Sequence, residues 1–199
     1  LVGSEMCIRD RYVEGIHRLG LADDLKLPIA GSSPAKIRMP KKDKRGKQYV
    51  NWSKTTLPWM SIGYETQIPP ISTLTFYNAI ANNGKMMRPR FVKQVIKDGQ
   101  VIMDFPPEVV KGHEQIAKPQ TIKTMQTILE HVVSQGLGKK AGSPSFKVAG
   151  KTGTAQMSKG VAGYKSGTMN YLLSFAGFFP ADAPRYSCIV CIQKSGLPA

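Results

Sequence analysis

The chain contains few cysteines and few histidines, and it has no long apolar stretch. Its three cysteines are an odd number. Cys188 and Cys191 have the C-x-x-C spacing, but they stand in an alternating apolar run, where positions i and i+3 of a strand point to opposite faces. We therefore expect two buried small residues there, with neither a shared metal nor a redox pair. The cysteines do not indicate a redox compartment.

Several kinds of functional segment are absent from the sequence. No run of about eighteen apolar residues occurs, so nothing in it is long enough to span a membrane. The start of the chain also lacks the charged and apolar regions of a secretory signal peptide. Its three histidines, His17, His113 and His131, are scattered and have no carboxylate at a supporting spacing. We therefore expect no metal site, no Ser-His-Asp triad and no cofactor.

Acidic residues are also scarce: 13 Asp and Glu stand against 28 Lys and Arg, which gives a net charge of +15. Such a balance favours an anionic partner or surface, such as an acidic cell-wall polymer or lipid headgroups. Nucleic acid is the obvious alternative, but no helix-turn-helix, zinc-finger or RNP pattern appears. Seven of the basic residues fall within residues 36–47, a segment typical of a solvated loop. We expect no nucleic-acid partner.

The length and the apolar fraction of 41% predict a single α+β domain with one good-sized core. Apolar spacing and turn residues predict helices over 12–21, 72–82 and 119–134, a hairpin over 91–105 with Asp98-Gly99 as its turn, and antiparallel strands over 171–180 and 186–194. These strands would continue, as an antiparallel sheet flanked by helices, a strand that begins near residue 146.

The expected core is read from the same spacing. The core stripe of the third helix would consist of Ile122, Met125, Ile128, Leu129, Val132 and Val133. The segment 52–64 would also line the core, through Trp52, Leu57, Trp59, Met60 and Ile62. Pro69-Pro70 bars a helix, so Ser72 would cap the next one, and Asn83-Gly84 would close it in left-handed turn geometry.

The most informative stretch is FKVAGKTGTAQ, residues 146–156. Apolar residues lead into Lys151, Thr152, Gly153 and Thr154, and in an extended strand Lys151 and Gly153 would share one face while the threonines share the other. If this strand forms an open edge, its N–H and C=O groups can pair with an extended ligand. Gly153 would admit that ligand closely, and Lys151 with the hydroxyls could hold a carboxylate. The stretch predicts a site for a peptide that ends in an anion.

Two other interpretations of this stretch compete. A phosphate-binding loop, G-x-x-x-x-G-K-[ST], requires glycine at position 145, where the chain has Ser145, and no helical pattern follows Thr152. The phosphate loop therefore fails. A Lys-Thr-Gly tripeptide is also common in proteins, and most instances are a strand that runs into a turn, so the tripeptide alone does not establish a site.

The wider sequence resembles a known family. K-T-G is the third signature of penicillin-binding proteins and serine β-lactamases, and the form KTGTAQ is more similar to the transpeptidases. Residues 59–84, WMSIGYETQIPPISTLTFYNAIANNG, resemble the segment that class B penicillin-binding proteins carry between their second and third signatures. The resemblance extends from about Tyr12 to the C-terminus and is strongest to division-type (septal) peptidoglycan D,D-transpeptidases.

This resemblance implies a serine acyl-enzyme mechanism that cross-links the D-Ala-D-Ala stem peptides of peptidoglycan and that β-lactams intercept. It implies that Lys151 supplies positive potential, that Thr152, Gly153 and Thr154 bind the substrate carboxylate, and that the Thr154 backbone N–H is an oxyanion-hole donor. It also implies divisome and glycosyltransferase partners for the full-length protein. The location would be the periplasmic face of the bacterial inner membrane, with the membrane anchor outside this chain. The glycine-containing loop expected over residues 157–170 would form a rim of the substrate groove.

The chain departs from the family pattern in one respect. It contains no S-x-N, and its one S-x-x-K match, Ser33 to Lys36, has no helical pattern after it. We therefore expect a truncated transpeptidase domain over residues 12–199 that lacks the nucleophile and is inactive alone, with residues 1–11 as a non-native leader. The alternative is a non-catalytic basic binding or scaffold module of the cell-wall machinery. The gene sequence before Tyr12 would distinguish the two.

Overall fold

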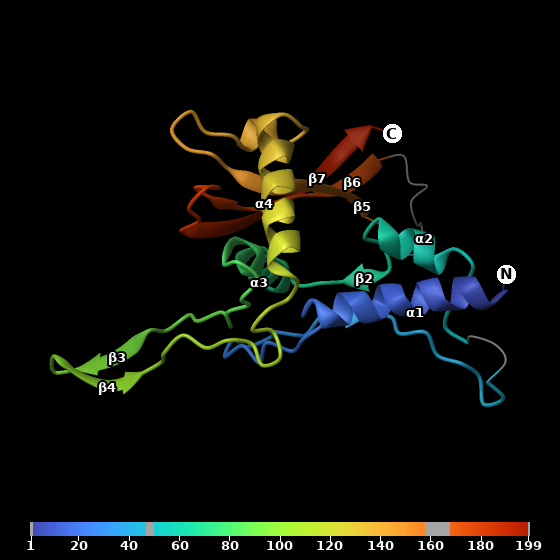
Figure 1. Ribbon diagram of the computed structural model, residues 1–199, viewed down its shortest axis with the longest axis horizontal. Coiled ribbons are helices and arrows are strands. Elements are labelled where there is room, and N and C mark those ends of the chain that lie inside the picture. Colours follow the sequence, from blue (N-terminus) through green and yellow to red (C-terminus); the bar gives the residue numbers. More distant parts are fainter. Residues whose placement is uncertain (1, 47–49, 158–167, 199) are drawn as a thin grey trace.

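The computed structural model describes residues 2–46, 50–157 and 168–198, and its arrangement is drawn in Figure 1. The helices are α1 (Val2–Arg18), α2 (Thr56–Ser61), α3 (Pro70–Ala81) and α4 (Pro119–Ser134), with a 3₁₀ turn at Lys139–Ala141. The strands are β1 (Lys36–Ile37), β2 (Thr66–Gln67), β3 (Gln94–Lys97), β4 (Gln100–Asp104), β5 (Ala149–Met157), β6 (Thr168–Phe179) and β7 (Tyr186–Pro198). The predicted α+β class is confirmed.

The main sheet has three antiparallel strands in the order β5-β6-β7, so β6 is central and β5 lies at one edge of the described sheet. The predicted strands over 171–180 and 186–194 are confirmed and are each slightly longer than expected. Both α3 and α4 pack against this sheet, as Figure 1 shows. The sheet and its two helices therefore form the body of the molecule.

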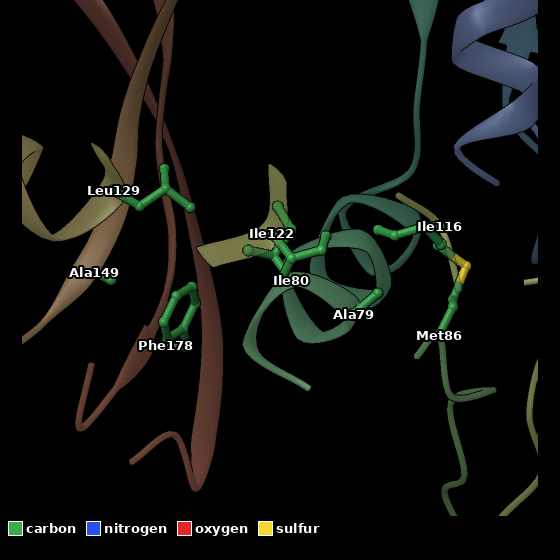
Figure 2. Close-up of a cluster of buried hydrophobic side chains, with 8 residues drawn as sticks. All are labelled: Ala79, Ile80, Met86, Ile116, Ile122, Leu129, Ala149 and Phe178. Carbon is green, nitrogen blue, oxygen red and sulfur yellow. The ribbon is translucent and has the colours of Figure 1, made fainter. Parts of the chain in front are cut away.

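The core lies between the sheet and these two helices. It consists of Ala79, Ile80, Met86, Ile116, Ile122, Leu129, Ala149 and Phe178. Figure 2 shows Phe178 and Leu129 beside the sheet, Ile80 and Ile122 between the helices, and Met86 on the far side of α3. Phe178 is fully buried, and its cross-strand partner on β5 is Ala149, also fully buried. The strand that carries the KTG sequence is thus anchored in the core at its first residue.

The third predicted helix is confirmed as α4, which begins at Pro119 in the first helical turn, where proline is tolerated. Its core stripe is narrower than expected. Ile122, Leu129 and Val133 are buried, whereas Met125 and Ile128 are 38% and 49% exposed. The prediction that these last two residues line the core is wrong, because the helix meets the sheet along one row of side chains.

The second predicted helix begins two residues early. α3 starts at Pro70 with Pro69 as its N-cap, and Ser72 lies buried in the first turn. The prediction that Ser72 caps this helix is therefore wrong. Proline fits there because the first helical N–H groups need no intrahelical acceptor. The predicted turn after the helix is confirmed: Asn83 and Gly84 have φ of 56° and 96°.

The segment 52–64 is only partly in the core. Within it, α2 buries Thr56 and Met60. Trp59 and Ile62 remain 43% and 68% exposed, so their predicted core position is wrong.

The first helix is also longer than predicted, because α1 begins at Val2 and runs without a break past Tyr12. That residues 1–11 are a non-native leader stays a prediction.

The predicted hairpin is confirmed as β3 and β4, joined by Asp98 and Gly99 with φ of 52° and 78°. Two consecutive residues with positive φ are typical of the type I′ turn that matches the twist of paired strands. Every residue of both strands is exposed. Figure 1 shows the hairpin projecting away from the sheet and helices.

Two further expectations concern the cysteines and the membrane. Cys188 and Cys191 are opposite Gly177 and Ser174 on β6, three positions apart, and so lie on opposite faces as predicted. Cys191 is exposed, however, and its predicted burial is wrong. Among the described residues, none of the helices has the length and apolar character needed to cross a bilayer.

Candidate substrate-binding strand

Lys151, Thr152, Gly153 and Thr154 lie in the first half of β5, and the backbone there is extended as predicted. β5 pairs with β6 on one side, and it is an edge strand of the described sheet. Nine consecutive residue pairs join β5 to β6 without a register shift. The strand is therefore held firmly along one side, and its other side is available to an extended ligand.

The direction of the backbone groups follows from one hydrogen bond at the end of the strand. The Gln156 N–H donates to the Tyr64 hydroxyl at 3.1 Å, so this N–H points away from β6. In an antiparallel pair, the N–H and C=O of alternate residues point to the same side. Thr154 and Thr152 lie two and four residues before Gln156 in the same regular register. Their backbone N–H and C=O groups therefore point toward the open edge.

The side chains alternate as the sequence predicts. Lys151 lies opposite Ala176 and Gly153 opposite Ser174, whereas Thr152 and Thr154 lie opposite Phe175 and Leu173. Directly opposite residues of an antiparallel pair share a face. Lys151 and Gly153 thus share the face that carries the buried residues Ala149, Ala176 and Phe178, and the two threonines share the other.

The lysine reaches back to the edge of its own strand. Its ammonium group donates a hydrogen bond of 2.8 Å to the Thr152 carbonyl, one of the groups that faces outward. The side chains of Lys151 and Thr154 are exposed, while Thr152 and Gly153 are half-buried. A cation, hydroxyl groups and outward-facing backbone N–H groups therefore lie together within four residues. This is a donor set suited to a carboxylate.

The missing side chain of Gly153 has an explanation within the sheet. A Cβ atom at this position would lie 2.4 Å from the Ser174 hydroxyl on β6. A similar constraint acts nearer the core, where Gly150 and Gly177 are opposite each other and a Cβ on Gly177 would lie 2.4 Å from the Ala149 carbonyl oxygen. A Cβ on Gly150 would also lie 2.5 Å from the ring of Phe175, so the glycines of this strand pair leave room for that ring and for the pairing of β5 with β6.

The structure adds a residue that sequence reasoning missed. Tyr64 follows α2, and its ring meets Trp59 edge-on at a centroid distance of 5.1 Å. Its hydroxyl accepts the Gln156 hydrogen bond, so it closes the open edge of β5 two residues beyond Thr154. The only signal in the sequence was that Tyr64 stands in the segment 59–84 that resembles the family. The available part of the edge is therefore centred on Thr152 and Thr154.

The S-x-x-K match lies elsewhere and lacks the helix that such a motif needs. Ser33 and Pro34 are in a loop, and Lys36 begins the two-residue strand β1. They line an open cavity of about 300 Å³ together with Gln67 and Pro69. The prediction that no helix follows Ser33 is confirmed.

The three histidines differ in their surroundings. His113 is nearly buried, and its Nε2 lies 2.7 Å from a carboxylate oxygen of Asp23. His17 and His131 are exposed. In the described part of the chain, no cluster of three His, Cys, Asp or Glu side chains could hold a metal ion. The loop predicted over residues 157–170 is shorter than expected, because Met157 belongs to β5 and residues 168–170 belong to β6, so its predicted ends are wrong. Its other residues, 158–167, lie outside the described residues.

Comparison with known proteins identifies the family. The family model described as the penicillin binding protein transpeptidase domain matches residues 10–198. Penicillin-binding protein PbpB of Mycolicibacterium smegmatis is 29% identical over 89% of this chain and 26% of its own length. PbpB of Mycobacterium tuberculosis is 30% identical over 89% of this chain and 25% of its own length.

A solved structure is similar over nearly the whole chain. It is penicillin binding protein 3 from Mycobacterium tuberculosis, complexed with ampicillin, which aligns with a TM-score of 0.71 and 29% identity over 94% of this chain and 39% of that one. The chain spans about a quarter of the length of the two PbpB relatives. The match to the family model covers nearly all of the sequence. The chain therefore belongs to the penicillin-binding protein transpeptidase domain family.

Proposed function

We propose that this chain carries the strand on which a peptidoglycan D,D-transpeptidase anchors the end of its stem-peptide substrate. The observation that supports this most directly is the geometry of β5. It is an edge strand, and the backbone groups of Thr152 and Thr154 face outward beside the ammonium group of Lys151. Family membership supplies the reaction, and the strand supplies a place for the substrate.

The proposed binding mode uses both backbone and side chains. The D-Ala-D-Ala end of the stem peptide would lie alongside β5 as an additional strand. Its terminal carboxylate would meet the threonine hydroxyls, with Lys151 providing positive potential. The Thr154 N–H would be one of two donors to the oxyanion. In other acyl-transfer enzymes, losing one such donor costs about 3 kcal/mol of transition-state stabilisation.

The proposed chemistry needs a serine nucleophile, and the described residues contain no S-x-x-K serine at the start of a helix. Its oxygen would attack the penultimate D-alanine carbonyl, and the peptide bond to the terminal D-alanine would break as that amine takes the proton. The amine of a neighbouring stem peptide would then attack the ester, form the cross-link and release the serine. We infer that another part of the full-length enzyme supplies this serine, and that the 199-residue chain alone does not acylate.

The same strand would receive β-lactams, which resemble the D-Ala-D-Ala end and carry a carboxylate. The similar penicillin binding protein 3 of known structure is complexed with ampicillin, which supports this proposal. We further propose that the full-length protein acts outside the cytoplasm, at the membrane face where peptidoglycan is assembled. A glycosyltransferase and division proteins would be its partners there.

Titration of the isotope-labelled chain with the peptide N-acetyl-D-alanyl-D-alanine tests the binding mode by NMR. We expect the amide signals of Thr152 and Thr154 to shift in a saturable way, and Lys151→Ala to weaken binding about tenfold through loss of the cation. Lys147→Ala is the matched control, because Lys147 is exposed and precedes the strand. Equal weakening in both variants, or shifts confined to other regions, would contradict the assignment of β5.

The inactivity of the chain is tested separately. Incubation with a fluorescent penicillin followed by denaturing electrophoresis should leave no covalent label. Stoichiometric labelling would show that a serine of this chain is the nucleophile, and Ser33→Ala would identify it if labelling were lost. Binding without labelling is the combination that supports the proposal, whereas neither binding nor labelling favours a non-catalytic scaffold module.

A further inference from the structure

The β3–β4 hairpin exposes an unusual amount of apolar surface. The exposed apolar residues between positions 91 and 105 are Phe91, Val92, Val95, Ile96, Val101, Ile102, Met103 and Phe105, with exposed fractions from 38% to 61%. They lie on a hairpin that projects from the body of the molecule (Figure 1). Clustered apolar side chains on a projecting element mark an interaction surface, since scattered single ones would need no explanation.

The base of the hairpin is fixed to the body, so the hairpin has a defined geometry. The Arg88 guanidinium donates to the carbonyls of Leu25 and Lys26 and forms an ion pair of 3.2 Å with Glu108. The Arg90 guanidinium donates to the Phe105 carbonyl across the two arms. A hairpin held at its base presents its edges to a partner with less loss of conformational freedom on binding than a free segment would.

The two edges of the hairpin differ. The Phe105 N–H donates to the Lys93 carbonyl, so Lys93 faces β4, and by alternation Gln94 and Ile96 direct their N–H and C=O groups away from it. β3 is regular, whereas the register shifts between Val95 and Ile96 leave Ile102 as an extra residue on β4. A bulge of this kind protects an edge against strand pairing. The β3 edge is therefore the one open to another strand.

The charges along β3 indicate the chemistry of a partner. Residues 91–97 contain Lys93 and Lys97 and no acidic residue. Both lysines are exposed, as are the apolar side chains between and before them. The acidic residues nearby, Asp98 and Asp104, lie in the turn and at the end of β4. The β3 edge thus combines outward-facing backbone groups, apolar side chains and positive charge.

We propose that the β3 edge binds an extended segment of another protein, rich in alternating apolar and acidic residues, which adds a strand to the hairpin. Backbone hydrogen bonds to Gln94 and Ile96 would set the register, apolar side chains would cover Val95 and Ile96, and carboxylates would pair with the lysines. The hairpin and β5 lie on different elements, so this interaction does not depend on the transpeptidase site.

The test uses the full chain and a fluorescein-labelled peptide of alternating valine and glutamate, followed by fluorescence anisotropy. Ile96→Pro removes one outward N–H from the β3 edge and should weaken binding by about tenfold or more. Val101→Pro is the matched control: Val101 is the cross-strand partner of Ile96, and proline there removes an outward N–H from the β4 edge. It should change the affinity less than about twofold.

A second pair of measurements separates strand pairing from charge. Reversing both charges, Lys93→Glu with Lys97→Glu, should abolish binding of the valine-glutamate peptide and create binding of a valine-lysine peptide. Amide signals of Lys97 and Gln100, which flank the turn, report whether each variant keeps its hairpin.

Several outcomes would overturn the proposal. Equal binding by the two proline variants would remove the role of the β3 edge, and equal binding of polyglutamate would reduce the interaction to charge alone. If sedimentation shows concentration-dependent dimers and Ile96→Pro abolishes them, the β3 edge binds a second copy of the chain instead. If the chain is retained on vesicles that contain anionic lipid and Ile96→Pro loses this retention, the partner of the β3 edge is a membrane surface.

Discussion

β6 and the β3–β4 hairpin have the same kinds of residues and opposite fates. Both are rich in large apolar residues: β6 carries Met, Tyr, Leu and Phe, and the two hairpin strands carry Val, Ile and Met. Phe178 on β6 is fully buried beneath α3 and α4, whereas Ile96 on β3 is 61% exposed. The difference lies in what covers the strands, because α3 and α4 pack on one face of the main sheet and the hairpin projects alone (Figure 1). An apolar strand therefore indicates a contact surface. Whether that surface becomes part of the core depends on whether helices of the same chain cover it.

The largest expected effect comes from truncating one side chain in each region. Phe178→Ala removes a ring from the centre of the core, and we expect it to lower the free energy of unfolding by about 3–5 kcal/mol. Ile96→Ala should change it by less than about 0.5 kcal/mol, since that side chain has few contacts to lose. Urea unfolding followed by circular dichroism measures both. Similar losses in the two variants would mean that the hairpin packs against the body in solution.

A smaller effect is expected at Gly177, where β6 leaves no room for a side chain beside the β5 backbone. Gly177→Ala would place its Cβ 2.4 Å from the Ala149 carbonyl oxygen, a backbone atom that cannot move without shifting the strand pair. We expect a loss of about 1–3 kcal/mol of unfolding free energy. Gly15→Ala in α1 is the control, because a Cβ there meets no atom within 4 Å. An unchanged midpoint for Gly177→Ala would show that the two strands are farther apart than described.

A milder loss of stability, which a second substitution should restore, is expected at Gly153. Its added Cβ would meet the Ser174 hydroxyl, which belongs to a side chain and can rotate away, so we expect a loss of about 1 kcal/mol. Ser174→Ala removes that oxygen and leaves the Ser174 Cβ at 3.8 Å, an ordinary contact. Adding it to Gly153→Ala should restore most of the stability, as a double-mutant cycle would measure. If the double variant is no more stable than Gly153→Ala, Ser174 is not the reason for glycine at this position.

Sequence patterns predicted the elements well and their surroundings less well. The strand at Lys151, the helix α4 and the Asp98-Gly99 turn follow from local periodicity and turn chemistry, which act over a few residues. The exposure of Met125 depends instead on the width of the contact with the sheet. Register-dependent contacts were likewise unpredictable, because the pairing of Gly153 with Ser174 is fixed by the whole β5–β6 alignment.

The candidate site shows the same division. Lys151 and Thr154 are recognisable because they belong to one short motif on one strand. Tyr64 closes the same edge from a position 92 residues earlier in the chain, and nothing local marks it for that role. Contacts between distant segments are set by the packing of the helices against the sheet. A single sequence therefore identifies the strand β5, but not the residue that ends its open edge.

The smallest expected effect concerns pH and one partly buried ring. Burial raises the pKa of Tyr77, on α3, above the ordinary value of about 10. The unfolded chain therefore loses this proton at a lower pH than the folded chain, so the unfolding free energy should fall as the pH rises from about 10 through the raised pKa. Tyr77→Phe should flatten this slope relative to the parent chain. Chemical unfolding at a series of alkaline pH values measures the difference, and an identical slope in the variant and the parent chain would show that Tyr77 ionises as readily in the folded chain as in the unfolded one.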